Sequence, residues 1–249
     1  MRRTIAKPCR VSSVSEKQQT TSRRARLREQ TSAEIKEIAL KLMADGGPDA
    51  ISLRAIAREM GMTAGAIYSY FPTRDDLVTT LIQDVYTAVV EAAESARDAV
   101  PDTDPGGRIM AWGRAVRGWA LANPEGFRLI YGDPVPGYQA PPAGPGHDAE
   151  VRACTGLMGL VAAAWPAAAG HRTDGARYDW DDFDPVLVGH AREHFPDLPP
   201  EAIALTLRVW GRMHGLMALE VYGHLRSLVK DAESVYCDEM RELVASLGL

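Results

Sequence analysis

The sequence predicts an all-α fold, and three features of the chain support this class. Apolar residues recur at positions i, i+3, i+4 and i+7 in successive segments, which is the spacing of one helix face. Residues that favour helix starts precede these segments, and glycine or proline follows several of them. Beyond Pro101 no segment alternates apolar and polar residues as a half-buried strand does.

Length and composition are those of a soluble protein with one large domain or two small ones. Of the 249 residues, 46% are hydrophobic and 24% are charged, and no apolar run approaches the roughly 20 residues that a membrane span needs. The three cysteines, Cys9, Cys154 and Cys237, are an odd number in unrelated contexts. They suit a reducing compartment better than a disulfide framework, so we expect a cytoplasmic protein without a membrane partner.

The charge is distributed unevenly along the chain. Residues 1–30 carry a net charge of +7 and the remaining residues −12, which together give −5. Residues 1–30 are rich in Arg, Ser, Thr and Gln, so we expect a mostly disordered basic arm. A basic end on an acidic body suggests that this end meets phosphate groups. The alternative is a solvated tail whose charge only aids solubility.

The next expected element is a helix that begins at about Thr31. Thr31 and Glu34 have the spacing of a capping box, in which each side chain bonds the backbone N–H of the other residue. The pair Gly46-Gly47 stops this helix, and Pro48 prevents its resumption.

Residues 52–72 predict two short helices around a tight turn. Ser52 is placed to cap the first helix, whose inner face holds Leu53, Ile56, Ala57 and Met60. Gly61 permits the reversal, and Thr63 can cap a second helix that runs to about Tyr70 before Pro72 ends it. This is a helix-turn-helix, whose second helix can enter a DNA major groove.

The remaining chain predicts a longer series of helices. Thr73 can cap a long helix that begins at Arg74 and ends before Pro101, and Pro105-Gly106-Gly107 is expected to break the chain. Irregular loops are expected over residues 133–147 and 170–182. The other expected helices cover about 108–122, 124–132, 148–165, 185–194, 199 to beyond 221, and 232–247.

The segment IKEIALKLMADGGPDAISLRAIAREMGMTAGAIYSYFPTRDDLVTTLI resembles the DNA-binding domain of the TetR family of transcriptional regulators. The resemblance covers about fifty residues and includes the Ser-Leu-Arg-x-Ile-Ala segment, the Gly-Met-Thr turn and Ile-Tyr-x-Tyr-Phe-Pro. It implies a three-helix DNA-binding domain over residues 31–78. It also implies a helical effector-binding and dimerisation domain over residues 79–249, with no catalytic residue, metal or cofactor.

A second resemblance lies near the C-terminus. The segment Trp210-Gly211-Arg-Met-His214-Gly215 is similar to the Trp–His–Gly helix in one subgroup of TetR-family effector domains. It implies that this helix contributes to the effector site.

The expected DNA-binding residues lie on and around the second short helix. Thr63, Tyr68 and Ser69 can donate to phosphates or base edges, and Ala64 can contact a thymine methyl group. Gly65 lets the backbone approach DNA closely or is a packing glycine, and Ser52 and Thr73 double as caps and phosphate donors. By resemblance, Tyr70 and Arg74 match phosphate-binding positions of the family.

Ala64 stands where family members often carry Lys or Arg. We therefore hypothesise that a group of arginines in the N-terminal arm follows the DNA backbone or enters the minor groove, namely Arg23, Arg24, Arg26 and Arg28.

The candidate ligand-binding residues are aromatic and methionine side chains of the C-terminal helices. Trp210 and His214 share one helix face at i, i+4. His214 either supplies one hydrogen bond to a largely apolar or aromatic ligand or is a core histidine. The candidates are Trp112, Trp119, Phe127, Tyr131, Trp165, Trp210, Met213, His214 and Met217.

The last two helices carry apolar residues suited to a four-helix homodimer interface, with an intramolecular hairpin as the alternative. Together with the resemblance, this predicts a homodimeric, ligand-responsive regulator that binds a palindromic double-stranded DNA operator, and a repressor by the family's usual mode.

Two rival interpretations depend on one short segment. His190-Ala-Arg-Glu193-His194 spells the zinc-hydrolase pattern H-x-x-E-H, but no third ligand is evident and the segment stops at Pro196. A metal-sensing site would join His190 and His194 to the acidic residues Asp179, Asp181, Asp182 and Asp184. An enzyme is the weaker class, since no G-x-S-x-G elbow or phosphate loop is present.

Overall fold

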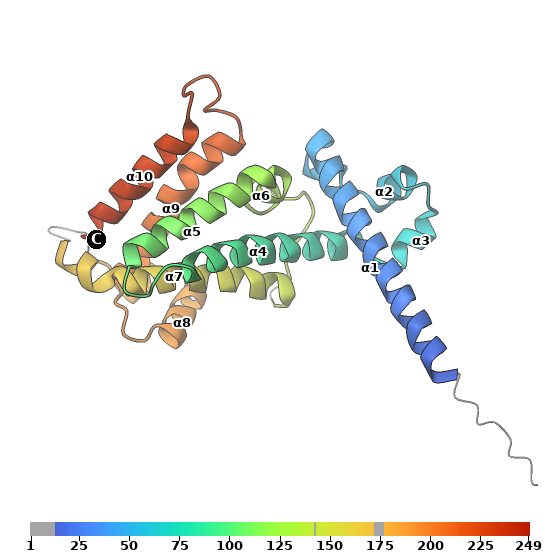
Figure 1. Cartoon of the computed structure of the whole chain (residues 1–249), viewed down its shortest axis with the longest axis horizontal. Coiled ribbons are helices and arrows are strands. Elements are labelled where there is room, and N and C mark those ends of the chain that lie inside the picture. Colours follow the sequence, from blue (N-terminus) through green and yellow to red (C-terminus); the bar gives the residue numbers. More distant parts are fainter. Residues whose placement is uncertain (1–12, 142, 172–176) are drawn as a thin grey trace, which may run out of the picture. The chain divides into compact units, whose positions relative to one another are not determined.

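The computed structural model describes residues 13–141, 143–171 and 177–249, and within these the side chains from residue 23 onward except that of Pro145. Within these residues every regular element is a helix and there is no strand, which confirms the all-α class (Figure 1). The chain divides into two compact units, Met1–Leu77 and Val78–Leu249. The elements are α1 (Ser13–Gly46), η1 (Pro48–Ala50), α2 (Leu53–Glu59), α3 (Ala64–Tyr68), α4 (Arg74–Asp98), α5 (Pro105–Ala122), α6 (Pro124–Tyr131), α7 (Pro145–His171), η2 (Trp180–Asp182), α8 (Pro185–His194), α9 (Pro200–Val221) and α10 (Ala232–Ser246).

The first unit packs α1, α2 and α3 around one small core. α2 contacts both α1 and α3, and all three helices contribute side chains with almost no exposure. Gly47 and Gly61 have φ of +78° and +65°, a region that residues with a Cβ rarely adopt, so both turns depend on glycine. The core residues are Ile35, Ala39, Met43, Ile51, Leu53, Ile56, Ala57, Ile67 and Phe71.

The start of α1 differs from the sequence prediction. The helix begins at Ser13, so the expectation of disorder is wrong for residues 13–30, while residues 1–12 lie outside the described residues. Thr31 is inside the helix, where its hydroxyl donates to the carbonyl of Leu27 at 2.9 Å, and the predicted capping box with Glu34 does not form. Arg, Gln and Glu are good helix formers, and this propensity extends the helix although residues 23–30 bury no apolar face.

The second unit is built from α4 to α10 around a larger core. α5, α7, α9 and α10 pack against one another and supply most of its buried side chains. Tyr236 of α10 is 1% exposed, and its hydroxyl donates to the carbonyl of Gly113 in α5 at 3.0 Å. This bond satisfies a buried hydroxyl and fixes α10 on α5.

Two element boundaries in this unit correct the sequence prediction. Pro105-Gly106-Gly107 does not break the chain but forms the first turn of α5. Pro105 suits the first helical position, and the Asp104 carboxylate accepts a bond from the Gly107 N–H at 2.7 Å. α7 runs to His171 with Pro166 inside it, whereas the sequence placed its end near Trp165.

α7 also corrects the expectation that no helix has the length and composition of a membrane span. An 18-residue stretch within Gly146–His171 has a mean hydropathy of 1.4, and the helix is long enough to cross a membrane. Met158, Val161 and Ala164 of this helix are fully buried against neighbouring helices. The apolar character of α7 is therefore that of a core helix in the second unit.

Candidate DNA-binding surface and ligand cavity

The turn before α3 is fixed by local bonds that the sequence predicted in part. The Thr63 hydroxyl accepts a bond from the Ala66 N–H at 3.3 Å, which confirms the predicted cap. Ser52 occupies the N-cap position of α2, but its side chain makes no capping bond. The Ser69 hydroxyl donates to the carbonyl of Ala66 at 2.7 Å and so tightens the end of α3.

α3 turns one apolar side chain inward and leaves several positions open to solvent. Ile67 is fully buried, whereas Thr63, Gly65, Tyr68 and Ser69 are exposed and Ala64 is half-buried. A Cβ added to Gly65 would meet nothing within 4 Å, so Gly65 is not a packing glycine in this unit. These solvent-facing positions thus offer hydroxyl groups and an accessible backbone, and α3 itself carries no charged side chain.

Tyr70 and Arg28 form a contact that joins α1 to the end of α3. The Arg28 Nη2 donates to the carbonyl of Ser69 at 2.8 Å, and its Cζ lies 4.8 Å from the centre of the Tyr70 ring. Such a cation–π contact with a hydrogen bond contributes about 1 kcal/mol or more. Arg28 therefore positions the recognition helix, although the sequence grouped it with arginines that reach toward DNA.

Arg74 and Thr73 are also engaged within the first unit. Arg74 Nε donates to the carbonyl of Ile51 at 2.9 Å and Nη2 to that of Pro48 at 3.0 Å, which holds the connection between η1 and α2. Thr73 and Asp76 form a capping box at the start of α4, with both backbone–side-chain distances at 3.0 Å. The contacts that the structure shows for both residues are internal, and their phosphate contacts stay a prediction.

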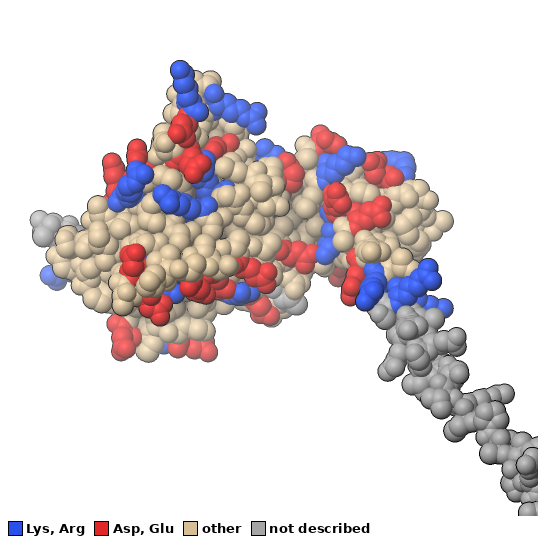
Figure 2. All heavy atoms as spheres, in the orientation of Figure 1, with Lys and Arg blue, Asp and Glu red and all other residues tan. Residues whose placement is uncertain are grey.

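Arg23, Arg24 and Arg26 are exposed on the extension of α1. Figure 2 shows basic side chains gathered where the grey residues of this helix give way to described ones. The basic segment is therefore helical from Ser13 onward, and the contact of its arginines with the DNA backbone or minor groove stays a prediction. A helix with exposed arginines suits contact with successive phosphates along a DNA backbone.

The second unit contains a largely apolar cavity of about 380 Å³. Six of the nine predicted ligand-binding residues line it: Trp112, Tyr131, Trp210, Met213, His214 and Met217. Trp119, Phe127 and Trp165 do not. Phe127 is fully buried behind the wall, where its ring stacks on His214 at 5.2 Å between centroids, and Trp119 lies over Gly126. Trp165 packs against the main core.

Sequence reasoning missed twelve residues of the cavity wall. Most of them belong to α4 and α7, whose periodicity shows which residues face inward but not which of those face a void. The Trp112 ring packs so closely on α7 that a Cβ at Gly156 would lie 2.5 Å from it, which shows how glycine shapes this wall. The missed residues are Tyr86, Val89, Val90, Ala93, Val116, Ile130, Glu150, Ala153, Cys154, Leu157, Thr206 and Leu207.

His214 is the polar centre of the aromatic wall. Its ring stacks on Phe127 and meets the Tyr131 ring edge-on at 4.7 Å, and the Phe127 and Tyr131 rings also contact each other at 5.2 Å between centroids. Burial lowers the pKa of His214, so the imidazole is neutral at neutral pH. Its buried Nδ1 has no hydrogen-bond partner among the described residues, which is costly for a buried polar atom.

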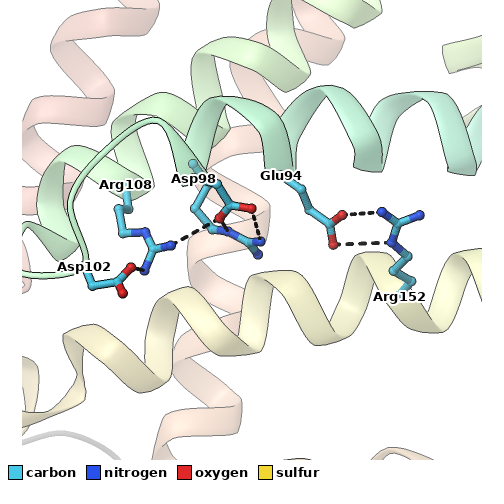
Figure 3. A network of polar contacts seen from close by, with 6 residues as sticks. Glu94, Asp98, Asp102, Arg108 and Arg152 are labelled. Atoms are coloured by element: carbon cyan, nitrogen blue, oxygen red, sulfur yellow. Dashed lines mark hydrogen bonds and ion pairs between the residues drawn. The ribbon is translucent and has the colours of Figure 1, made fainter.

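Ion pairs hold the α4 wall of the cavity in place (Figure 3). Arg152 of α7 pairs with Glu94 of α4, with Nε 3.3 Å from Oε1. Arg108 of α5 pairs with Asp98 at 3.2 Å and with Asp102 at 2.5 Å. The α4 segment that contributes Tyr86 to Ala93 is thus tied to α7 and α5 just beyond the cavity.

The segment H-x-x-E-H does not form a metal site in the described chain. His190 Nε2 lies 2.7 Å from the Thr155 hydroxyl, and His194 Nδ1 lies 3.1 Å from the carbonyl of His190. Asp179 and Asp182 cap η2, and Asp184 caps α8 by accepting from the Val186 N–H at 2.8 Å. Among the described residues no three His, Cys, Asp or Glu side chains are grouped to hold a metal ion. The cysteines described, Cys154 and Cys237, are free thiols, and Cys9 lies outside the described residues.

Together, a capped helix-turn-helix and a second helical unit with a largely apolar cavity define a DNA-binding regulator of two domains. Residues 35–81 match the family described as bacterial regulatory proteins, tetR family, and residues 109–243 match the tetracyclin repressor-like C-terminal domain. The chain belongs to the TetR family of transcriptional regulators. Regulators of this family are generally not enzymes, and they typically act as dimers with small-molecule effectors.

Several relatives share nearly the whole chain. The HTH-type transcriptional regulators Rv1816 of Mycobacterium tuberculosis and Mb1846 of Mycobacterium bovis are each 35% identical over 228 residues, which cover 89% of this chain and 94% of theirs. The crystal structure of a regulatory protein, SCO4313, has a TM-score of 0.70 at 32% identity, covering 89% of this chain and 98% of that one. The TetR-family regulator PfmR of Thermus thermophilus shares the fold, with a TM-score of 0.56 at 16% identity over 86% and 98% of the two chains.

Proposed function

We propose that this protein is a ligand-responsive transcriptional repressor. It binds a palindromic operator as a homodimer, and a small, largely apolar or aromatic effector releases it. The observation that carries this proposal is the course of α4. This 25-residue helix begins beside the helix-turn-helix at the Thr73–Asp76 capping box, and its segment Tyr86–Ala93 walls the cavity. A ligand that fills the cavity therefore acts on a helix that starts in the DNA-binding unit.

The exposed residues of α3 and the exposed arginines of α1 support the contact with the operator. Thr63, Tyr68 and Ser69 are exposed and carry hydroxyl groups that can bond phosphates or base edges. Because α3 lacks charge, we assign much of the phosphate binding to Arg23, Arg24 and Arg26. Arg28 supports them by holding the end of α3 in place.

Exposed apolar side chains and glycines at α9 support the homodimer. Leu219 of α9 and Tyr222, the residue that follows the helix, are 42% and 41% exposed, which is unusual for large apolar residues beside this core. A Cβ at Gly211 or Gly215 would meet nothing within 4 Å, so a helix of a second copy has room to approach closely. Paired half-sites about 34 Å apart or a multiple of it also require two recognition helices.

Release follows from a shift between two conformations. An effector that binds better to a conformer whose recognition helices are wrongly spaced lowers operator affinity by its difference in affinity for the two states. The Glu94–Arg152 pair ties α4 to α7, so a ligand that presses on the cavity wall must work against this contact.

The proposal is tested by selecting binding sites from a pool of random DNA duplexes with the full-length protein. The expected result is an enriched inverted repeat that binds a dimer tightly, with Tyr68→Ala weakening this binding and Leu121→Ala, an exposed change in α5, leaving it unchanged. Enrichment of no sequence, with equal and steeply salt-dependent binding to every duplex, would contradict it.

A further inference from the structure

The ligand cavity carries a single charged side chain. Its lining is formed by aliphatic, aromatic and sulfur-containing residues, with hydroxyl groups from Tyr86, Tyr131 and Thr206 and the imidazole of His214. Among the described residues that line it there is no Lys, Arg or Asp, and Glu150 of α7 supplies the only carboxylate. Because burial keeps His214 neutral, the net charge of the cavity wall at neutral pH is negative.

Glu150 has no cationic partner in the described part of the chain. The nearest arginine along α7, Arg152, pairs instead with Glu94 of α4. Glu150 is exposed and also lines the cavity, so it lies where the cavity opens to solvent. A carboxylate there stays hydrated without a ligand, and it is available to a ligand that enters.

The electrostatic influence of Glu150 reaches the interior of the cavity. Burial, and after it the charge of Glu150, raise the pKa of Tyr131 to about 12. The same two causes, in the same order, raise the pKa of the Cys154 thiol. These groups therefore remain protonated at neutral pH and present hydroxyl and thiol groups, while the negative potential comes from one carboxylate.

A free carboxylate head group is poorly suited to such a site. Its charge would be repelled by the Glu150 carboxylate, and no arginine or lysine among the described lining residues offsets this repulsion. A head group that donates hydrogen bonds meets an acceptor instead, and a cationic donor also gains Coulomb attraction. The volume of about 380 Å³ holds an aromatic or branched apolar body beside such a head group.

We propose that the cavity selects apolar ligands with a hydrogen-bond-donating head group, above all a protonated amine, that Glu150 receives, and that it discriminates against apolar carboxylates. Glu150 is thus a residue that determines specificity by charge. The inference rests on the proposed function, because it assigns a chemical class to the effector of the same cavity.

The test uses three probes with one apolar body and three head groups: 4-phenylbutylamine, 4-phenylbutan-1-ol and 4-phenylbutanoate. Binding to the full-length protein is measured at neutral pH by calorimetry and by tryptophan fluorescence, since Trp112 and Trp210 line the cavity. Glu150→Gln removes the charge with little change in shape, and Glu150→Asp keeps it. Asp148→Asn is the matched control, because Asp148 lies two residues away in α7, is exposed and does not line the cavity.

The expected order for the wild type is amine, alcohol, carboxylate, with the amine about fivefold tighter than the alcohol, as for a partly exposed ion pair. Glu150→Gln should bring the amine to the level of the alcohol and tighten the carboxylate, while Asp148→Asn keeps the wild-type order. The inference would be overturned if Glu150→Gln bound the three probes in the same order of affinity as the wild type. It would also be overturned if the wild type bound the carboxylate most tightly, or bound none of the probes.

The outcomes also separate this inference from the proposed function. If the duplex selection yields an operator and the probes bind without regard to charge, the regulator stands and the role of Glu150 fails. If the amine preference depends on Glu150 and no duplex is selected, the cavity has the proposed chemistry in a protein that is not an operator-binding repressor.

Discussion

The helix-turn-helix and the ligand cavity of this protein are determined by interactions of very different range. The first depends on contacts between residues three or four apart, such as the Thr63 cap of α3 and the Thr73–Asp76 box of α4, and on the positive φ of Gly61. The cavity instead brings α4, α5, α6, α7 and α9 together from residues 86 to 217. Local motifs can therefore be read directly from a sequence, whereas a void depends on how well distant helices fill space.

The largest expected effect concerns the packing behind the cavity. Phe127→Ala removes a fully buried ring that stacks on His214, and it should lower the free energy of unfolding of the second unit by about 3–5 kcal/mol. Urea unfolding followed by tryptophan fluorescence measures this change. Leu121→Ala, at a residue 38% exposed, is the control and should change stability by about 0.5 kcal/mol or less. Equal losses in both variants would show that Phe127 does not support the cavity wall.

A smaller effect is expected where α1 meets the recognition helix. Arg28→Ala removes the bond to the Ser69 carbonyl and the contact with the Tyr70 ring, so operator affinity should fall about tenfold. Anisotropy titrations across a salt series measure both affinity and its salt dependence.

Arg24→Ala is the comparison, because Arg24 is exposed and makes no such contact with α3 among the described contacts. It should weaken binding and reduce the salt slope by about one phosphate contact. If Arg28→Ala behaved in the same way with α3 undisturbed in NMR spectra, Arg28 would be a phosphate ligand and not a positioning residue.

The N-terminal caps of the two short helices, α2 and α3, should differ in how much they contribute to the stability of the first unit. Thr63→Ala removes the bond to the Ala66 N–H and should cost about 1 kcal/mol in the stability of the first unit, while Thr63→Ser retains it. Ser52→Ala should cost less, because the Ser52 side chain makes no capping bond. Thermal unfolding of the three variants provides the measurement, and a larger loss for Ser52→Ala would reverse this ranking.

The smallest expected effect is a pH dependence that belongs to the second unit. Burial lowers the pKa of His214 below that of the unfolded chain, so the unfolded state binds more protons once the pH falls below about 6.5. Stability should then decrease from pH 7 toward pH 5, and burial acts on His190 in the same direction. His214→Phe should flatten the profile measured by urea unfolding, and an unchanged profile would mean that His214 titrates alike in both states.

The elements predicted from the sequence show the same division between local and distant determinants. The helix-turn-helix and the start of α4 at Arg74 follow from caps and glycine or proline stops. The prediction was wrong for residues 13–30, because a polar composition indicates disorder while helix propensity favours extension of α1. It was also wrong at Pro105, which starts α5 instead of breaking the chain.

For the cavity, sequence reasoning found the aromatic and methionine residues but not the ones that give it polarity and shape. Trp210, Met213, His214 and Met217 could be found because they share one face of α9. Phe127 has the same residue type as a pocket aromatic, yet packing places it behind the wall. Glu150 gave no sequence signal, since a glutamate on a helix is usually part of a solvated face.

The most direct test of this account measures whether the cavity and the operator are coupled. Anisotropy titration of the selected operator duplex is carried out with and without saturating 4-phenylbutylamine, in the wild type and in Val116→Trp, which fills the cavity from α5. We expect the amine to weaken operator binding by the wild type at least about fivefold, the lower range of allosteric coupling, and to leave operator binding by Val116→Trp unchanged. Equal operator affinity of the wild type with the cavity occupied and empty would contradict it.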